Sequence, residues 1–142
     1  MSNTQGTAQV YDFRIPITKR DDAKRLIYGW AAVVTKADGT PVVDLQGDVT
    51  PIDEIEKAAH KALAFGGRGK TGVQHEHTGV GDIVESCIIN KAFREAHGMP
   101  AGPEGWWVGM KIHDESVWKR IESGELSELS FKGTARRTAM AA

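Results

Sequence analysis

The segment LIYGWAAVVT, residues 26–35, decides the fold class. It is apolar on both faces and rich in aromatic and β-branched residues, which predicts a buried β-strand. Asp38 and Gly39 follow it, and these residue types supply the backbone geometry of a tight turn. We therefore expect a short return strand at 42–45.

A helix is predicted after this hairpin, ending at about residue 65. Its start combines Thr50 as a hydroxyl cap, Pro51 at the first helical position and Asp53 in the first turn, where the helix dipole favours acids. The glycines at 66 and 67 end it. The apolar residues fall on one stripe at helical spacing, namely Ile52, Ile55, Ala58, Ala59, Ala62 and Leu63.

The remainder of the chain is dominated by predicted strands. They are expected at 72–77, 83–90, 106–112 and 125–134, with one short helix at 114–123 that ends at Gly124. The pattern predicts a mainly β (α+β) fold. We expect a single domain at 11–137, a polar and disordered N-terminus at 1–10 and a flexible end at 138–142.

Composition narrows the function classes. The chain has 142 residues, with 18 Lys plus Arg against 19 Asp plus Glu, so no strong net charge draws it to nucleic acid or to an anionic membrane. The apolar runs fall short of the roughly 20 residues that cross a bilayer. The lone cysteine, Cys87, excludes an intrachain disulfide and suits a reducing cytoplasm.

Ser130 is the candidate nucleophile in the last predicted strand, ELSELSFKG at 125–133. Alternation places Ser130 and Lys132 on the face opposite Leu129 and Phe131, so its hydroxyl projects away from the apolar neighbours that fix the strand. A serine hydroxyl is a weak nucleophile until a base accepts its proton. A histidine is therefore required nearby.

His75 and His77 form a local pair in the segment VQHEHTG, residues 73–79. If this segment is extended, both imidazoles point to the same side. The spacing fits a general base with a second histidine beside it, and it equally fits two ligands of a metal ion. The motif alone leaves both interpretations open.

Glu85 is the third candidate. Alternation in IVESCII, residues 83–89, places it on the face of Ile83, Cys87 and Ile89. A carboxylate among apolar groups needs a partner, and an imidazole would offset its desolvation. Such a pair would orient the histidine and stabilise its charged form.

Six segments in a fixed order carry a family resemblance. They are YGWA at 28–31, QGD at 46–48, the histidine segment at 73–79, GDIVES at 81–86, WWVGMK at 106–111 and LSFKG at 129–133. Together they resemble the phage serine protease family of the XkdF type, over residues 27–133. That family is related to the phage prohead proteases, which are similar in fold to the herpesvirus assemblins.

The resemblance implies a small β-barrel flanked by helices, and a serine endopeptidase that matures capsids without a cofactor. Its expected substrates are the scaffold and major capsid proteins, its expected location is the assembling prohead in the host cytoplasm, and self-association is expected. His75 matches the catalytic histidine and Ser130 the nucleophile. No histidine or acid follows Ser130, so Glu85 and then His77 are the candidates for the third member.

Oxyanion stabilisation has two candidate sources. Arg136 and Arg137 resemble the arginine pair of assemblin-like enzymes, at a shorter spacing from the serine. Backbone donors close to Ser130 or Gly133 are an equal alternative.

Two other functions remain compatible with the sequence. The first is a catalytically silent capsid or scaffold component with the same fold, which would be supported if His75 did not reach Ser130. The second is a metal-binding barrel that uses His75 and His77 with an acid such as Glu85.

Overall fold

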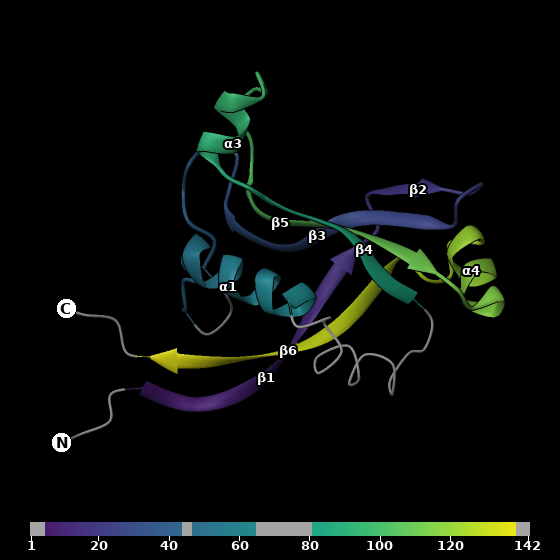
Figure 1. Cartoon of the computed structure of the whole chain (residues 1–142), viewed down its shortest axis with the longest axis horizontal. Coiled ribbons are helices and arrows are strands. Elements are labelled where there is room, and N and C mark those ends of the chain that lie inside the picture. The colour runs from purple at the N-terminus through teal and green to yellow at the C-terminus, as the bar shows by residue number, and fades with distance from the viewer. Residues whose placement is uncertain (1–4, 44–46, 65–80, 139–142) are drawn as a thin grey trace.

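The computed structural model of the protein describes residues 5–43, 47–64 and 81–138, with the backbone alone for 5–13 and 131–138. The described strands form a two-stranded sheet of β1 and β6 and a four-stranded sheet of order β2-β3-β5-β4 (Figure 1). All strand pairs are antiparallel. The strands are β1 (Gln5–Pro16), β2 (Lys19–Asp21), β3 (Leu26–Thr35), β4 (Gly81–Ile89), β5 (Glu104–Ile112) and β6 (Glu128–Thr138). The mainly β (α+β) class is confirmed, and the described strands do not close into a barrel.

Strand β3 occupies the predicted residues but buries only one face fully. Ile27, Ala31 and Val34 are buried in the core, whereas Tyr28 and Trp30 on the other face are half-buried. The core face of the neighbouring strand β5 is formed by Trp106, Val108, Met110 and Ile112. The expectation of a strand buried on both faces was therefore too strong, because only the inner face is covered by described elements.

Helix α1 (Ile52–Leu63) covers the inner face and contacts β4, β5 and β6. Its N-cap is Pro51, which makes no side-chain cap, so the expected hydroxyl cap from Thr50 is not formed. The helix buries Ile55, Ala59 and Ala62 of the predicted apolar stripe, whereas Leu63 at its end is exposed. No helix of the described residues is long and apolar enough to cross a bilayer.

Helix α4 (Glu115–Glu122) confirms the short helix predicted before the last strand. The Asp114 carboxylate caps it by accepting a hydrogen bond from the Val117 amide at 3.0 Å. Gly124 follows the helix with a φ of 82°, a conformation that favours glycine. Trp118 and Ile121 are buried, and they anchor the helix on the sheet.

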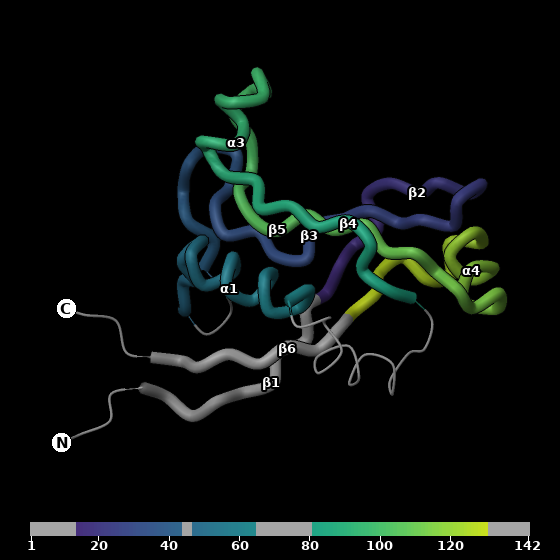
Figure 2. The backbone as a smooth tube through the Cα atoms, in the orientation of Figure 1, coloured from purple at the N-terminus to yellow at the C-terminus, as the bar shows by residue number. Residues whose placement is uncertain are grey.

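Two short elements escaped the sequence analysis. Strand β2 adds an edge to the sheet beside β3, and helix α3 (Lys91–Ala96) lies in the connection between β4 and β5, which projects from the sheet (Figure 2). The Asn90 side chain caps α3 by accepting from the Phe93 amide at 2.8 Å. Both elements are too short to show a hydrophobic period.

The expected return strand at 42–45 is not a strand in its described part. Residues 41–43 make only isolated bridges, from Pro41 to Thr35 and from Val43 to Val49. The strand expected at 72–77 lies outside the described residues.

The chain ends differ most from the sequence expectation. Strand β1 begins at Gln5, within the stretch expected to be disordered, and pairs with β6 as far as Thr138. The backbone hydrogen bonds of a strand do not require apolar side chains, so a polar segment can pair as a strand. Residues 1–4 and 139–142 lie outside the described part.

Gly29 allows the β1–β6 ribbon to pack on the four-stranded sheet. A Cβ atom at this position would clash with the Pro16 carbonyl oxygen and would lie 2.8 Å from the Ile15 Cγ2 atom. Ile15 is fully buried, so the end of β1 lies directly on the inner face of β3. A glycine inside a strand marks this kind of close backbone approach.

We predict that Gly29→Ala destabilises the protein by about 1–3 kcal/mol, because the added methyl meets backbone that cannot move alone. Gly109→Ala is the matched control. A Cβ there would meet Tyr28 Cε1 at 2.8 Å and Glu85 Oε2 at 3.1 Å, which can turn toward solvent, and Glu85 Cβ at 3.1 Å, which requires a shift of only a few tenths of an ångström. Urea unfolding monitored by tryptophan fluorescence would measure both. Equal losses would contradict the close approach at Gly29.

Candidate active site

Ser130 lies near the start of β6, at the point where the ribbon packs on the sheet. Its neighbour Leu129 is buried in the core, whereas Ser130 itself is exposed. The alternation of the strand therefore turns the serine away from the core, as predicted. The strand is held through the register pairs Ile15 with Leu129 and Arg14 with Ser130.

Arg14 is the residue directly across from Ser130. Its neighbour Ile15 is buried while Arg14 is exposed, so Arg14 and Ser130 share the outer face of the ribbon. Arg14 Nη1 lies 3.7 Å from Glu128 Oε1, two residues before Ser130. Among the side chains that the structure describes, the surroundings of the serine thus include the cation Arg14 and the anion Glu128, which the sequence analysis did not identify.

The sequence alone could predict only part of the position of Arg14. The alternation of Phe13, Arg14 and Ile15 is typical of a strand with one buried face. Its partner, however, is contributed by the other end of the chain, and pairing over such a separation leaves no local mark.

His75 and His77 lie in residues 65–80, outside the described part of the chain. The structure therefore gives no distance from either imidazole to Ser130, and the predicted roles of both histidines stay predictions. Strand β4 begins at Gly81, directly after this segment.

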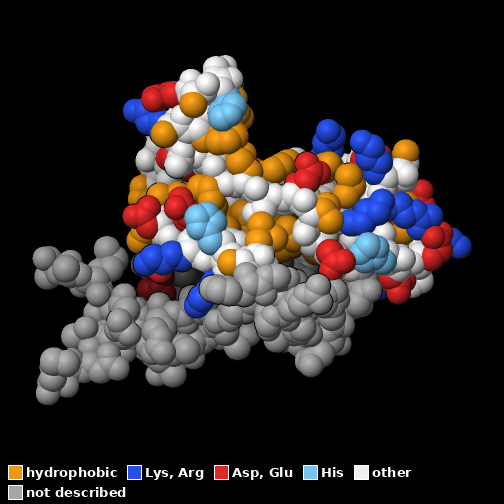
Figure 3. All heavy atoms as spheres, viewed as in Figure 1, with side chains coloured by type: hydrophobic (Ala, Val, Ile, Leu, Met, Phe, Trp, Pro, Cys, Tyr) orange, Lys and Arg blue, Asp and Glu red, His pale blue; other side chains and the backbone are white. Residues whose placement is uncertain are grey.

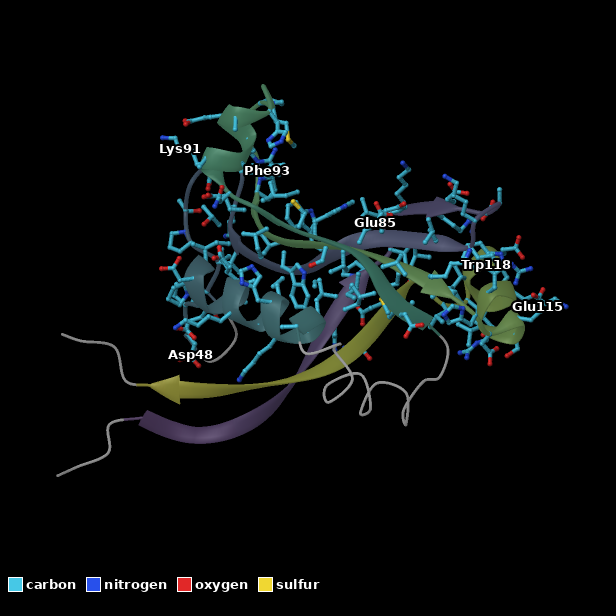
Figure 4. The ribbon with its side chains drawn as sticks, viewed as in Figure 1. Asp48, Glu85, Lys91, Phe93, Glu115 and Trp118 are labelled. Atoms are coloured by element: carbon cyan, nitrogen blue, oxygen red, sulfur yellow. The ribbon has the colours of Figure 1, made fainter. Side chains whose placement is uncertain are left out.

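Glu85 lies on β4 and is paired with a tyrosine. Tyr28 Oη donates to Glu85 Oε2 at 2.6 Å, and the bond passes over Gly109 of the strand between them. Figure 4 shows Glu85 on the side of the sheet away from β6. The structure therefore does not bring Glu85 to Ser130, and within the described residues the partner of this carboxylate is Tyr28.

The face around Glu85 is aromatic. Trp30 and Trp107 meet edge to face, with ring centroids 5.2 Å apart, and the Lys19 ammonium lies 5.4 Å from the centre of the Tyr28 ring. Figure 3 shows hydrophobic side chains along the surface between α3 and β2. The hydrogen bond to Glu85 raises the pKa of Tyr28, with burial as the next cause.

The oxyanion candidates follow Ser130 along β6. The backbone register pairs Gly133 with Tyr11 and Arg136 with Ala8, and Arg137 belongs to the same strand. At about 3.3 Å per residue, Gly133 is about 10 Å from Ser130 along the strand and the two arginines are about 20 Å away or more.

One described histidine has a carboxylate partner. His113 Nε2 lies 2.8 Å from Asp82 Oδ2, and both side chains are exposed. The sequence analysis did not identify this pair. No group of three His, Cys, Asp or Glu side chains in the described residues could hold a metal ion.

Comparison with known proteins agrees with the ordered motifs. Residues 14–139 match the family model described as "Putative phage serine protease XkdF". Two curated proteins of Bacillus subtilis (strain 168) are similar. One is the uncharacterized protein YqbD, 36% identical over 84% of this chain and 34% of its own length. The other is the phage-like element PBSX protein XkdF, 32% identical over 86% of this chain and 41% of its own length.

The chain spans only between a third and a half of the length of these relatives. No solved structure matches the chain. The chemistry of the site must therefore be argued from its own residues.

We predict that Glu85→Ala lowers the pKa of Tyr28 toward the ordinary tyrosine value. In the wild type the carboxylate accepts a hydrogen bond from the phenolic hydroxyl, which stabilises the protonated form of the tyrosine. Ultraviolet absorbance of tyrosinate against pH measures this, with Tyr28→Phe identifying the signal. Glu104→Ala is the control for a carboxylate elsewhere. An unchanged titration in Glu85→Ala would contradict the hydrogen bond.

Proposed function

Because the chain belongs to the family described as "Putative phage serine protease XkdF", we propose that it is a serine endopeptidase with Ser130 as nucleophile and His75 as general base. The observation that carries the proposal is the exposure of Ser130 on a strand that is fixed by the buried residue before it, Leu129, and by the buried partner of Leu129, Ile15. A nucleophile needs this combination of access and fixed position.

The proposed reaction is acyl transfer to water. His75 accepts the proton of the Ser130 hydroxyl while the oxygen attacks the carbonyl carbon of a peptide bond. The imidazolium then gives this proton to the leaving amine, and an acyl-enzyme remains. Water, deprotonated by the same histidine, releases the acid and restores the serine.

The third catalytic member is proposed from the same two candidates. Glu85 would have to leave Tyr28 and act from the opposite face of the sheet, which argues against it. His77 is two residues from His75 in the chain, which favours a place near the proposed base. We therefore favour His77 over Glu85, in the reverse of the order that the sequence favoured.

The biological setting is part of the proposal. Scaffold and major capsid proteins are the proposed substrates, cleaved inside the assembling prohead in the host cytoplasm by a self-associating enzyme. This setting rests on the resemblance to prohead proteases and on the relative named for a phage-like element.

We predict that a fluorophosphonate adds once to the wild-type protein and not to Ser130→Ala, as measured by intact mass. Ser127→Ala is the matched control, since this serine is exposed and lies just before the same strand. His75→Ala should slow the labelling by about 10²- to 10⁴-fold, the usual size of a general-base contribution.

The opposite result is equally informative. If the folded wild type gains no adduct, or if Ser130→Ala still gains one, the proposed nucleophile is wrong. A catalytically silent assembly component or a metal-binding role for His75 and His77 would then become the better interpretation.

A further inference from the structure

The exposed face of the β1–β6 ribbon places charges at fixed positions beside Ser130. Arg14 is its cross-strand partner, and Glu128 precedes it by two residues on the same face. Side chains directly opposite each other in an antiparallel pair have Cβ atoms about 4.5–5.5 Å apart. A substrate that reaches the Ser130 hydroxyl therefore passes the Arg14 side chain.

The packing beneath the ribbon fixes this arrangement. Ile15 is fully buried and Leu129 nearly so, and these two residues are themselves a register pair. A shift of one residue in either strand would turn its buried residue, Ile15 or Leu129, toward solvent and its charged neighbour, Arg14 or Glu128, toward the core. Arg14 is thus held opposite Ser130 by the hydrophobic core.

The two charges are free to take another partner. The Arg14 side chain is 70% exposed and the Glu128 side chain 43% exposed. Their closest nitrogen and oxygen atoms are 3.7 Å apart, beyond hydrogen-bond distance. An exposed ion pair of this kind contributes little, so exchanging its carboxylate for one from a ligand costs little.

We infer that Arg14 is a specificity-determining residue that binds an acidic side chain of the substrate next to the scissile bond. This inference rests on the proposed function, and it names the class of substrate as acidic. The guanidinium donates charge-assisted hydrogen bonds to the substrate carboxylate. Glu128 competes with that carboxylate for the same donors.

The experiment compares two fluorophosphonates of equal length, one with a carboxylate at the end of its tail and one with the methyl ester. The rate of adduct formation at Ser130 is followed by intact mass on the full chain. For the wild type we expect the carboxylate probe to react about two- to fivefold faster, the factor that corresponds to an exposed ion pair of up to about 1 kcal/mol.

Substitutions of Arg14 and Glu128 test whether this ion pair causes the preference for the carboxylate probe. In Arg14→Gln the two probes should react at equal rates, and in Arg14→Lys part of the preference for the carboxylate probe should remain. In Glu128→Gln this preference should increase, because the competing carboxylate is gone. Lys36→Gln, at the exposed turn after β3, is the control for a lost positive charge and should keep the wild-type ratio. The ratio should fall toward one in 1 M salt, which screens exposed charges.

The outcomes separate the two proposals. Equal rates for the two probes on the wild type, or a ratio that survives in Arg14→Gln, overturn the role of Arg14 and leave the nucleophile intact. Failure of both probes to label Ser130 overturns the proposed function instead. Thermal unfolding of each variant confirms that the comparison is made on folded protein.

Discussion

The close contact between Gly29 and the end of β1 is the constraint on which the rest of the structure depends. Because no side chain stands at this position, the carbonyl of Pro16 lies directly on the sheet and Ile15 enters the core. Strand β6 is then fixed by its pairing with β1, and Ser130 is fixed by its place in β6. The position of the proposed nucleophile therefore follows from a missing methyl group on another strand.

The two faces of the four-stranded sheet serve different purposes. The inner face buries Trp106 and Val108 under α1 and the ribbon, and it supplies the stability of the domain. The outer face carries Tyr28 and Glu85, bonded to each other, beside a pair of half-buried tryptophans. Since the four-stranded sheet stands between Glu85 and the β1–β6 ribbon that packs on its inner face, this carboxylate is badly placed to assist Ser130 on the ribbon.

The sequence predicted the elements whose patterns are local. The strand at 26–35, the helix ended by Gly124 and the exposure of Ser130 all follow from periodicity and capping within a few residues. Prediction from the sequence failed where a feature depends on residues that are distant in the chain. Order in the polar segment from Gln5 depends on β6, and the neighbour of Ser130 depends on a register set at the opposite end of the chain. Glu85 was correctly placed on a strand, but a register shift after Ile83 puts it on the face opposite Ile83, where the sequence did not predict it. Its hydrogen bond to Tyr28 depends on the glycine between them.

The pairing of β1 with β6 also constrains the order in which the elements of the protein can fold. The strand that bears Ser130 gains its partner only by closing a loop that contains nearly the whole described chain. Contacts of such high sequence separation form late and slowly, because the entropy of closure is lost before they contribute. A polypeptide still emerging from the ribosome would hold its first strand without the last one. In the proposed enzyme, Ser130 would therefore reach its place opposite Arg14 only after synthesis has passed β6.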